Sequence, residues 1–252
     1  MEERVSFDSE GHKIIGDFNL LRRGAPCVIM SHGLESTKDG RKWLALARTL
    51  DATGIGYLRF NYRGCGEGDD RSDGAFEDMT LTARIADFRA AIDFVETMGV
   101  DRNRIGAVGS SFGGMVVLAA GDARLKAMVA IATPAGPPKG LSGVGRQVGR
   151  PSAQPQGGMV EMPSGRKLRL AYFQDVACYD LCQAASNLAR PLLIIHGSDD
   201  ELVAVDDARA LHASAKPPKQ IAIIPGGDHQ LAGPDHLWQV VQLTIGWFKR
   251  YL

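Results

Sequence analysis

The stretch Arg104–Val117, RIGAVGSSFGGMVV, is a short apolar run that breaks into two serines and a glycine-rich turn and then resumes as a second apolar pattern. Glycine and serine are common in ordinary turns, which is one interpretation of the break. The other is a nucleophile elbow, a sharp turn that holds one serine hydroxyl at the top of a sheet. The spacing of Gly109, Ser111 and Gly113 fits this Gly-x-Ser-x-Gly pattern. The surrounding sequence has to decide between the two.

The composition predicts one large folded unit. With 252 residues, 44% of them hydrophobic, the chain can bury a single large core. Its 29 basic and 29 acidic residues balance, so the total charge favours neither nucleic acid nor an anionic membrane as a partner. The charged N-terminus lacks the apolar run of a signal peptide, and no later apolar run is long enough to cross a membrane. We therefore expect one domain over residues 1–252 of a soluble, cytoplasmic protein.

No motif in the chain indicates a metal or a cofactor. The stretch GCGEGDD follows an apolar run and resembles a dinucleotide-binding loop, but the third glycine of GxGxxG would fall at Asp69. No GxxxxGK[ST] or HExxH pattern occurs, and the histidines lack the spacing of metal ligands. The four cysteines show no CxxC spacing, so we expect unpaired, mainly structural thiols. We expect neither a cofactor nor a metal site.

Short apolar runs alternate with helical patterns along the chain. Nearly continuous apolar runs, typical of buried parallel strands, occur at 27–30, 55–62, 105–108, 128–132, 192–195 and 221–224. Helical apolar stripes lie between most of them, at about 43–50, 81–98, 115–120, 204–213 and 237–252. This alternation predicts a mostly parallel, twisted sheet with helices on both faces. The first part of the chain reads as two strands joined by a turn at residues 9–11, an antiparallel edge to that sheet.

A segment rich in proline and glycine interrupts this alternation. Residues 134–163 hold six of the twelve prolines, so we expect neither a strand nor a long helix there, and then one helix at about 168–182. The alternative, a linker between two domains, is disfavoured because both flanks look like strands of one sheet. A long loop inside a compact domain is usually a lid or a binding loop. We therefore expect a lid insertion over about residues 134–189.

Three of the expected strands lead into residues that are able to form a catalytic triad. Ligands of open parallel sheets bind beyond the carboxyl ends of the strands. Ser111 follows the run at 105–108, Asp199 and Asp200 follow a later run, and His229 follows the last one. Serine, acid and histidine in this order form the chain order of the α/β-hydrolase triad. The partners of the serine therefore favour the nucleophile elbow over an ordinary turn.

Neighbouring serines and histidines compete for two of these places. Ser111 is favoured over Ser110 because only Ser111 has a glycine two positions away on both sides. Three other histidines follow the serine: His196, expected in a structural role at a strand end, and His212 and His236, expected in helices. His229 lies near the sheet exit and is the expected base.

These motifs together resemble serine esterases of the α/β-hydrolase family. They are most similar to the compact branch of cinnamoyl and feruloyl esterases, with kinship to acylaminoacyl-peptidase-like hydrolase domains. The resemblance covers nearly the whole chain and rests on the stretches GHKIIGDFNL, SHGLES, NYRGCGEG, GSSFGG, IIHGSDDELV and PGGDHQL. Two positions depart from the family pattern: Glu67 stands where serine is usual, and Ala204 where proline is often found.

The resemblance implies an α/β-hydrolase fold and places the remaining site residues. The register of HGSDDELV against the family pattern selects Asp200 rather than Asp199 as the acid. The register of SHGLES points to the backbone N–H of Leu34 as one donor of the oxyanion hole, and the fold supplies the N–H of Phe112 as the other.

The expected function is the cleavage of a small-molecule carboxylic ester through an acyl-enzyme. Thioesterase or amidase activity and a non-catalytic scaffold or interaction protein on the same fold remain as alternatives, and the oligomeric state is open. Between residues 136 and 170 the expected lid carries six cationic side chains against Glu161 alone. These charges either keep an exposed loop solvated or favour esters that carry a negative charge.

Overall fold

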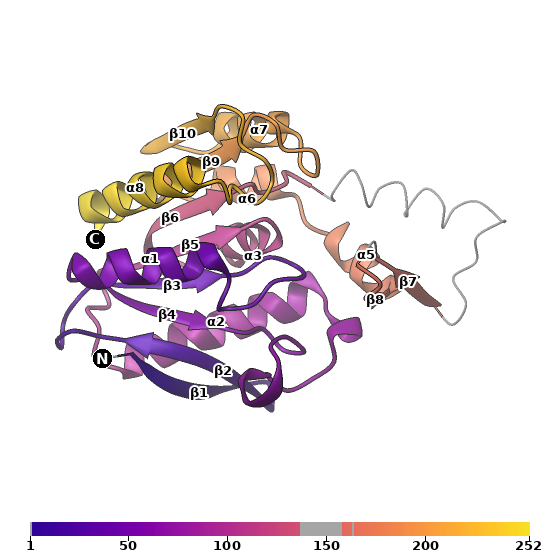
Figure 1. Ribbon diagram of the computed structural model, residues 1–252, viewed down its shortest axis with the longest axis horizontal. Helices are drawn as coiled ribbons and strands as arrows, with labels where there is room; N and C mark the ends of the chain where they lie inside the picture. Colours follow the sequence, from indigo (N-terminus) through magenta and orange to yellow (C-terminus); the bar gives the residue numbers. More distant parts are fainter. Residues whose placement is uncertain (1, 137–157, 163) are drawn as a thin grey trace.

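An eight-stranded sheet with helices on both faces forms the centre of the molecule, as the computed structural model shows for residues 2–136, 158–162 and 164–252 (Figure 1). Six neighbouring strands of this sheet, from β4 to β10 in the order given in the next sentence, pair in parallel. Strands β1 and β2 form an antiparallel edge beside them. In order across the sheet the strands are β1 Glu3–Ser9, β2 His12–Asn19, β4 Gly56–Phe60, β3 Cys27–Ser31, β5 Ile105–Ser110, β6 Leu125–Ile131, β9 Leu192–Gly197 and β10 Lys219–Ile224.

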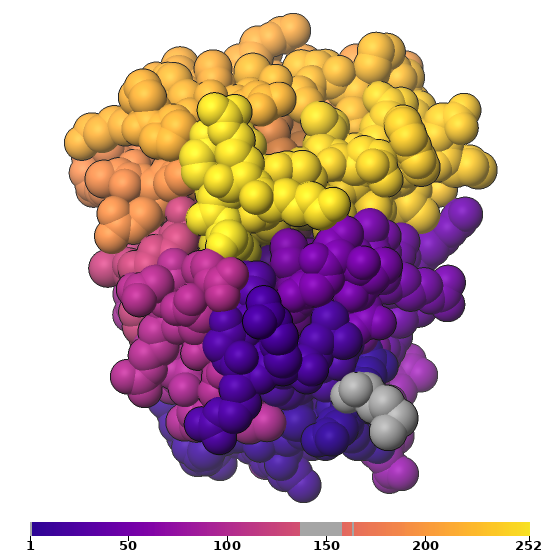
Figure 2. Space-filling model, turned by 90° about the vertical axis from the view of Figure 1, so that its left-hand side faces the viewer, coloured from indigo at the N-terminus to yellow at the C-terminus, as the bar shows by residue number. Residues whose placement is uncertain are grey.

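Two apolar layers join the sheet to its helices. One face packs against α1 Arg41–Ala52 and α8 Pro234–Tyr251. The other face carries α2 Leu81–Thr97, α3 Phe112–Ala120, α6 Leu181–Asn187 and α7 Val205–Ser214. Strands β3 and β5 are buried along their whole length, as expected for parallel strands covered on both sides. In the space-filling view the C-terminal segment, in yellow, lies against the purple N-terminal part of the chain (Figure 2).

The α/β-hydrolase fold expected from the sequence is confirmed, and so is the antiparallel hairpin at its edge. Helix α2 follows the predicted apolar stripe and begins at a cap, because the Thr80 hydroxyl accepts a hydrogen bond from the Ala83 N–H. All four cysteines are free, also as expected. No helix within the described residues is long and apolar enough to cross a membrane.

Two expectations for the segment between β6 and β9 are wrong. A strand, β7 Met159–Glu161, does form in the proline-rich part, because it pairs with β8 Lys167–Arg169 in a small separate hairpin. The single helix expected at 168–182 is two short helices, α5 Leu170–Val176 and α6, since Asp180 caps a new helix through the Gln183 N–H. Much of the expected lid, residues 137–157 and 163, lies outside the described residues.

The NYRGCGEG motif has a structural part in this fold. The Asn61 side chain accepts a hydrogen bond from the Lys38 N–H at 2.8 Å and donates one to the Asp70 carbonyl oxygen at 2.8 Å. The Arg63 guanidinium forms an ion pair with the fully buried Asp87 of α2 at 2.7 Å. These bonds join the loop after β4 to the loop after β3 and to helix α2. The motif therefore anchors loops next to the end of the sheet at which β3 and β5 terminate.

Helix α3 approaches strand β3 so closely that its second residue has to be glycine. A Cβ atom on Gly113 would lie 2.0 Å from the Ser31 carbonyl oxygen and 2.6 Å from that of His32. Both atoms belong to the backbone, so neither is able to swing aside as a flexible side chain would. Any larger residue must push helix and sheet apart.

We expect Gly113→Ala to lower the free energy of unfolding by about 1–3 kcal/mol, because overpacking forces backbone shifts. The matched control is Gly246→Ala in α8, where an added Cβ would meet nothing within 4 Å. That substitution should raise stability by about 0.5–1 kcal/mol, the usual gain of alanine over glycine inside a helix. Urea unfolding of the two variants checks this, and equal midpoints for Gly113→Ala and the parent would contradict the close approach.

Candidate active site

The serine of the opening motif lies at a strained turn between a strand and a helix. Ser111 separates β5 from α3 and has φ 54° and ψ −122°, a conformation with positive φ that a residue with a side chain rarely adopts. The strand and the helix lie very close together on either side of this turn, because a Cβ on Gly109 would lie 2.3 Å from the Gly113 carbonyl oxygen. The Ser111 N–H also donates to the Ile131 carbonyl oxygen of β6 at 2.8 Å. The local geometry is that of a nucleophile elbow.

Three sheet exits bring a serine, a histidine and a carboxylate into one line of hydrogen bonds. His229 Nε2 lies 3.0 Å from Ser111 Oγ, and His229 Nδ1 lies 2.8 Å from Asp200 Oδ2. When Nδ1 carries the proton that it donates to the carboxylate, Nε2 is left as the acceptor for the serine hydroxyl. The arrangement is thus able to move a proton from the serine to the imidazole and to stabilise the resulting imidazolium.

The Asp200 carboxylate is held from several sides. Its side chain is fully buried and accepts hydrogen bonds from the N–H groups of Leu202 and Val203 at 2.9 and 2.8 Å. His196 Nε2 lies 3.2 Å from Asp200 Oδ2. Burial acts to raise the pKa of Asp200, but hydrogen bonds from two histidines and a backbone N–H outweigh it and hold the pKa well below its ordinary value. Asp200 therefore stays ionised and its orientation is set.

The competing residues take other places. Ser110 ends β5, and its hydroxyl is 3.0 Å from Lys42 Nζ. The Asp199 carboxylate is exposed and accepts from the Ser198 hydroxyl at 2.6 Å. His196 is fully buried near the end of β9, and its Nε2 lies 3.0 Å from the Val203 carbonyl oxygen. As expected, His212 and His236 lie in helices α7 and α8.

A buried arginine holds the loop that follows β3. Arg84 of α2 is 0% exposed, and its guanidinium donates to the carbonyl oxygens of Gly33 at 3.1 Å and Leu34 at 3.0 Å. In a trans peptide the C=O of Gly33 and the N–H of Leu34 point in opposite directions, so the Leu34 N–H faces away from Arg84. A Cβ on Gly33 would lie 3.6 Å from Ser111 Cβ, which places this loop against the elbow.

The second backbone group expected at an oxyanion hole belongs to Phe112. Phe112 is the first residue of α3, so its N–H has no partner inside the helix. Leu34 and Phe112 both line the cavity that also contains Ser111 and His229. Sequence reasoning missed Arg84, although an arginine within the apolar stripe of α2 is itself a signal for a buried partner.

The cavity beside the serine has room for a small molecule. It measures about 560 Å³, within the range of about 300–1,000 Å³ usual for ligand pockets. Most of its wall is apolar and comes from both helical layers and from the segment after β6. The apolar lining residues include Trp43, Met115, Pro134, Met162, Tyr172, Leu202, Val203, Leu231 and Leu237. An apolar wall with a few polar groups at one end suits an organic substrate that carries one reactive bond.

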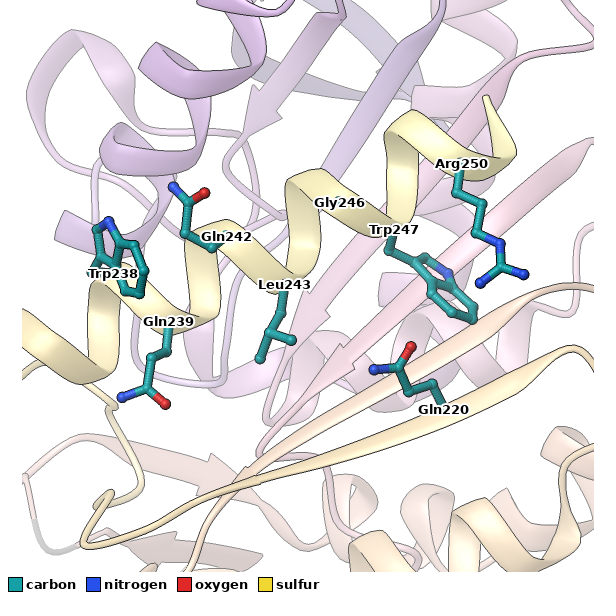
Figure 3. Close-up of a pocket in the computed structure, with 8 residues that line it drawn as sticks. All are labelled: Gln220, Trp238, Gln239, Gln242, Leu243, Gly246, Trp247 and Arg250. Atoms are coloured by element: carbon teal, nitrogen blue, oxygen red, sulfur yellow. The ribbon is translucent and has the colours of Figure 1, made fainter.

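A second hollow of about 430 Å³ lies between α8 and β10 (Figure 3). Its lining residues are Gln220, Trp238, Gln239, Gln242, Leu243, Gly246, Trp247 and Arg250. None of these described residues is a serine, cysteine, histidine or carboxylate, so they offer no nucleophile and no general base. Within the described ranges there is likewise no cluster of three or more histidine, cysteine or acidic side chains that is able to hold a metal ion.

Residues 28–239 match a family model described as "Alpha/beta hydrolase family". Quorum-quenching protein AidA of Acinetobacter baumannii (strain MDR-ZJ06) is 36% identical over 109 residues, which are 41% of this chain and 34% of that protein. The chain thus spans about a third of the length of AidA. Uncharacterized protein YfhR of Salmonella typhi is 31% identical over 235 residues, 90% of this chain and 74% of that protein.

Among solved structures, Est1E from Butyrivibrio proteoclasticus with bound ferulic acid superposes with a TM-score of 0.83. Its sequence is 23% identical to this one, and the match covers 98% of both chains. At that identity the likeness shows a shared fold.

His32, at the base of the loop held by Arg84, is a buried neutral imidazole. Its Nδ1 lies 2.8 Å from the Gly33 carbonyl oxygen, and its Nε2 accepts from the Tyr62 N–H at 3.3 Å. Protonation would remove that acceptor. Burial first, and then the positive charge of Arg84, lower the pKa of His32 from 6.5 to about 3.

We expect His32 to make the protein sensitive to mild acid. Between pH 6.5 and about 3 the unfolded state binds a proton at His32 that the folded state does not. The stabilising contribution is therefore complete above pH 6.5 and is lost as the pH falls through this window. Thermal unfolding midpoints between pH 7 and 4 should fall more steeply for the parent than for His32→Asn or His32→Gln. Parallel curves would show that His32 is not the group responsible.

Proposed function

The chain belongs to the alpha/beta hydrolase family, and on this premise we propose that it is a serine hydrolase that cleaves a small-molecule carboxylic ester through an acyl-enzyme. The observation that carries the proposal is the unbroken line of hydrogen bonds from Ser111 through His229 to Asp200. A serine hydroxyl alone is a poor nucleophile, and it needs a base in contact and a group that orients the base. All three groups lie at the wall of one cavity or directly behind it.

In the proposed reaction, Ser111 Oγ attacks the ester carbonyl carbon while His229 Nε2 takes the hydroxyl proton. The carbonyl oxygen becomes an oxyanion, which the backbone N–H groups of Leu34 and Phe112 stabilise. The tetrahedral intermediate then expels the alcohol, which receives the proton from His229. Water attacks the acyl-enzyme in the same way, with His229 as base, and releases the acid and free Ser111. Asp200 stays ionised throughout and orients the imidazole.

We propose that the described part of the segment after β6 acts as a lid. Met162, directly after β7, and Tyr172, in α5, both line the cavity and are buried. Tyr172 packs against Phe112 with ring centroids 5.4 Å apart, so this segment is in contact with the first turn of the helix that follows the nucleophile. Such a cover excludes water from the reacting bond and shapes the substrate pocket.

Two alternatives are separated by direct assays. A thioesterase or amidase would use the same triad, so matched ester, thioester and amide substrates with one acyl group have to be compared. The highest kcat/KM should belong to the ester. A non-catalytic protein on this fold would leave Ser111 unlabelled by a fluorophosphonate probe, whereas an activated serine is modified.

We expect Ser111→Ala to fold as the parent does and to lose ester turnover by at least about a thousandfold, because members of a triad act as a unit. Initial rates of ester hydrolysis, together with circular dichroism as a folding control, check this. A variant that keeps more than about a tenth of the activity would show that another group is the nucleophile.

The two neighbouring carboxylates form a matched pair for the acid. Asp200→Asn should lower kcat by about 10³–10⁴-fold, because the amide no longer orients His229 or stabilises its charge. Asp199→Asn should change kcat by less than about threefold, since its exposed carboxylate contacts only Ser198 among the described residues. Equal losses of kcat in the two variants would contradict the assignment of Asp200 as the residue that orients His229.

A further inference from the structure

A lysine lies in the wall of the cavity, next to the residue that precedes the nucleophile. Lys42 is the second residue of α1, and its Nζ donates to Ser110 Oγ at 3.0 Å. Lys42 lines the same cavity as Ser111 and His229. The ammonium group therefore contacts the residue that directly precedes Ser111, the nucleophile of the proposed function.

The protein gives this cation little compensation. An ammonium group has three hydrogen-bond donors, and the Ser110 hydroxyl is the one acceptor that contacts it within the described residues. No carboxylate of the described part of the chain forms an ion pair with Lys42 within 4.0 Å. Burial lowers the pKa of Lys42 to about 8, against the opposing charges of Asp228 and Asp200. The group is thus still mainly charged at neutral pH.

Lys42 also has the wrong charge for its place in the helix. The N-terminal turn of a helix carries a partial positive charge, which favours acidic side chains and disfavours lysine. Helix α1 has no acidic residue in its first turn to offset this. Neither hydrogen bonding, ion pairing nor the helix dipole therefore accounts for a partly buried ammonium here. A charge that lowers the stability of the free protein indicates that a group of opposite charge, carried by the ligand, pairs with it in the complex.

The other charged residues of the cavity differ from Lys42 in exposure. Glu35, Arg41 and Glu161 are all exposed to solvent, whereas Lys42 is partly buried. The Arg41 guanidinium also donates to the Ala232 carbonyl oxygen at 3.2 Å. Charges in contact with water are screened and bind a counterion weakly, and a cation at an apolar wall binds one more strongly. Lys42 is thus the strongest anchor for an anion among the described lining residues.

The cations of the lid offer no comparable anchor where they are described. Arg166 lies 3.3 Å above the ring of Phe76, and Arg169 forms an ion pair with Asp78. Both are thereby directed to the short helix η2 Phe76–Asp78 rather than to the cavity wall. Three other lid cations, Lys139, Arg146 and Arg150, lie outside the described residues. Lys167, the remaining lid cation that is described, is exposed and is not among the residues that line the cavity. Among the described residues, Lys42 is therefore the cation best placed to give a preference for negatively charged esters.

We propose that Lys42 binds a carboxylate of the substrate, and that the preferred substrates are esters with a carboxylate a few bonds from the scissile carbonyl group. This inference rests on the proposed esterase function. A single ammonium with free donors suits a monoanion such as a carboxylate. Lys42, Ser110 and Ser111 line one cavity of about 560 Å³, so the carboxylate and the reacting carbonyl group have to fit into it together. Monoesters of short dicarboxylic acids have this form.

The test compares pairs of substrates that differ in one charge and hardly in shape. Monoethyl succinate is paired with its neutral amide, ethyl succinamate, so that the carboxylate lies on the acyl side. Acetoxyacetate and acetoxyacetamide form the second pair, with the charge on the alcohol side. The measured quantity is the ratio of kcat/KM within each pair. The parent should prefer the charged member of one pair by about 10- to 100-fold, the range of a hydrogen bond to a charged group, and the pair that shows this identifies the side.

Three variants assign that ratio to a residue. Lys42→Met keeps the length of the side chain and should bring the ratio to about one, whereas Lys42→Arg should retain part of the preference because it retains the charge. The matched control is Arg48→Met, which removes one positive charge from the exposed side of the same helix and should leave the ratio unchanged. Lys42→Met should also unfold at the same or a higher temperature than the parent, because an uncompensated charge has been removed.

Each contrary result overturns a definite statement. A parent enzyme that cleaves both members of each pair equally well retains the proposed function but contradicts the carboxylate site. If Arg48→Met changes the ratio as much as Lys42→Met does, the preference comes from the overall charge of the protein and not from a contact with Lys42. A lower unfolding temperature of Lys42→Met with an unchanged ratio would make the lysine a structural residue. The proposed function itself fails if the parent cleaves neither the four test substrates nor any neutral ester, and if a fluorophosphonate does not label Ser111. The proposed carboxylate site then fails with it.

Discussion

The contact of three backbone segments at Ser111 is the constraint on which the site depends. Strand β5, helix α3 and the end of β3 approach one another so closely that only hydrogen atoms fit at Gly109 and Gly113. The strained conformation of Ser111 costs free energy, of order 1–3 kcal/mol, and persists because its neighbours leave no other path for the chain. The rigid turn presents the hydroxyl at a place that does not vary, which a flexible loop would not achieve.

Buried polar groups outside the triad keep the other members of the site in position. His196 lies beside Asp200 Oδ2, the oxygen that also faces His229, and two backbone N–H groups donate to the other oxygen, Oδ1. Arg84 holds the loop after β3 by donating hydrogen bonds to two of its backbone carbonyl oxygens. In each case the cost of burying a polar group is offset by hydrogen bonds made at fixed angles. The proposed reaction requires such groups to be in position before a substrate enters.

Two cations near the elbow, the buried Arg84 and the partly buried Lys42, differ in their partners. Arg84 has carbonyl oxygens, a thiol and two aromatic rings around its guanidinium, so the protein itself provides its partners. Lys42 has one hydroxyl and distant carboxylates. The protein supplies the partners of Arg84, so Arg84 stabilises the fold. Lys42 faces the cavity with donors that the protein does not satisfy, and for this reason we propose that it binds the substrate.

The sequence alone determined the alternation of strands and helices, the elbow around Ser111, and the candidates that follow the last two strands, His229 and the pair Asp199 and Asp200, from which the resemblance to the family selected Asp200. Such features depend on local patterns: apolar periodicity, glycines at fixed spacing and the chain order of parallel strands. The same patterns failed for the segment after β6, where Asp180 starts a new helix and β7 exists only because β8 lies beside it. Tertiary structure alone decided that Arg84 bonds the Leu34 carbonyl oxygen and that Lys42 bonds the Ser110 hydroxyl, partners that lie 50 and 68 positions away in the chain. A contact of that range depends on how whole layers pack, and no local pattern records it.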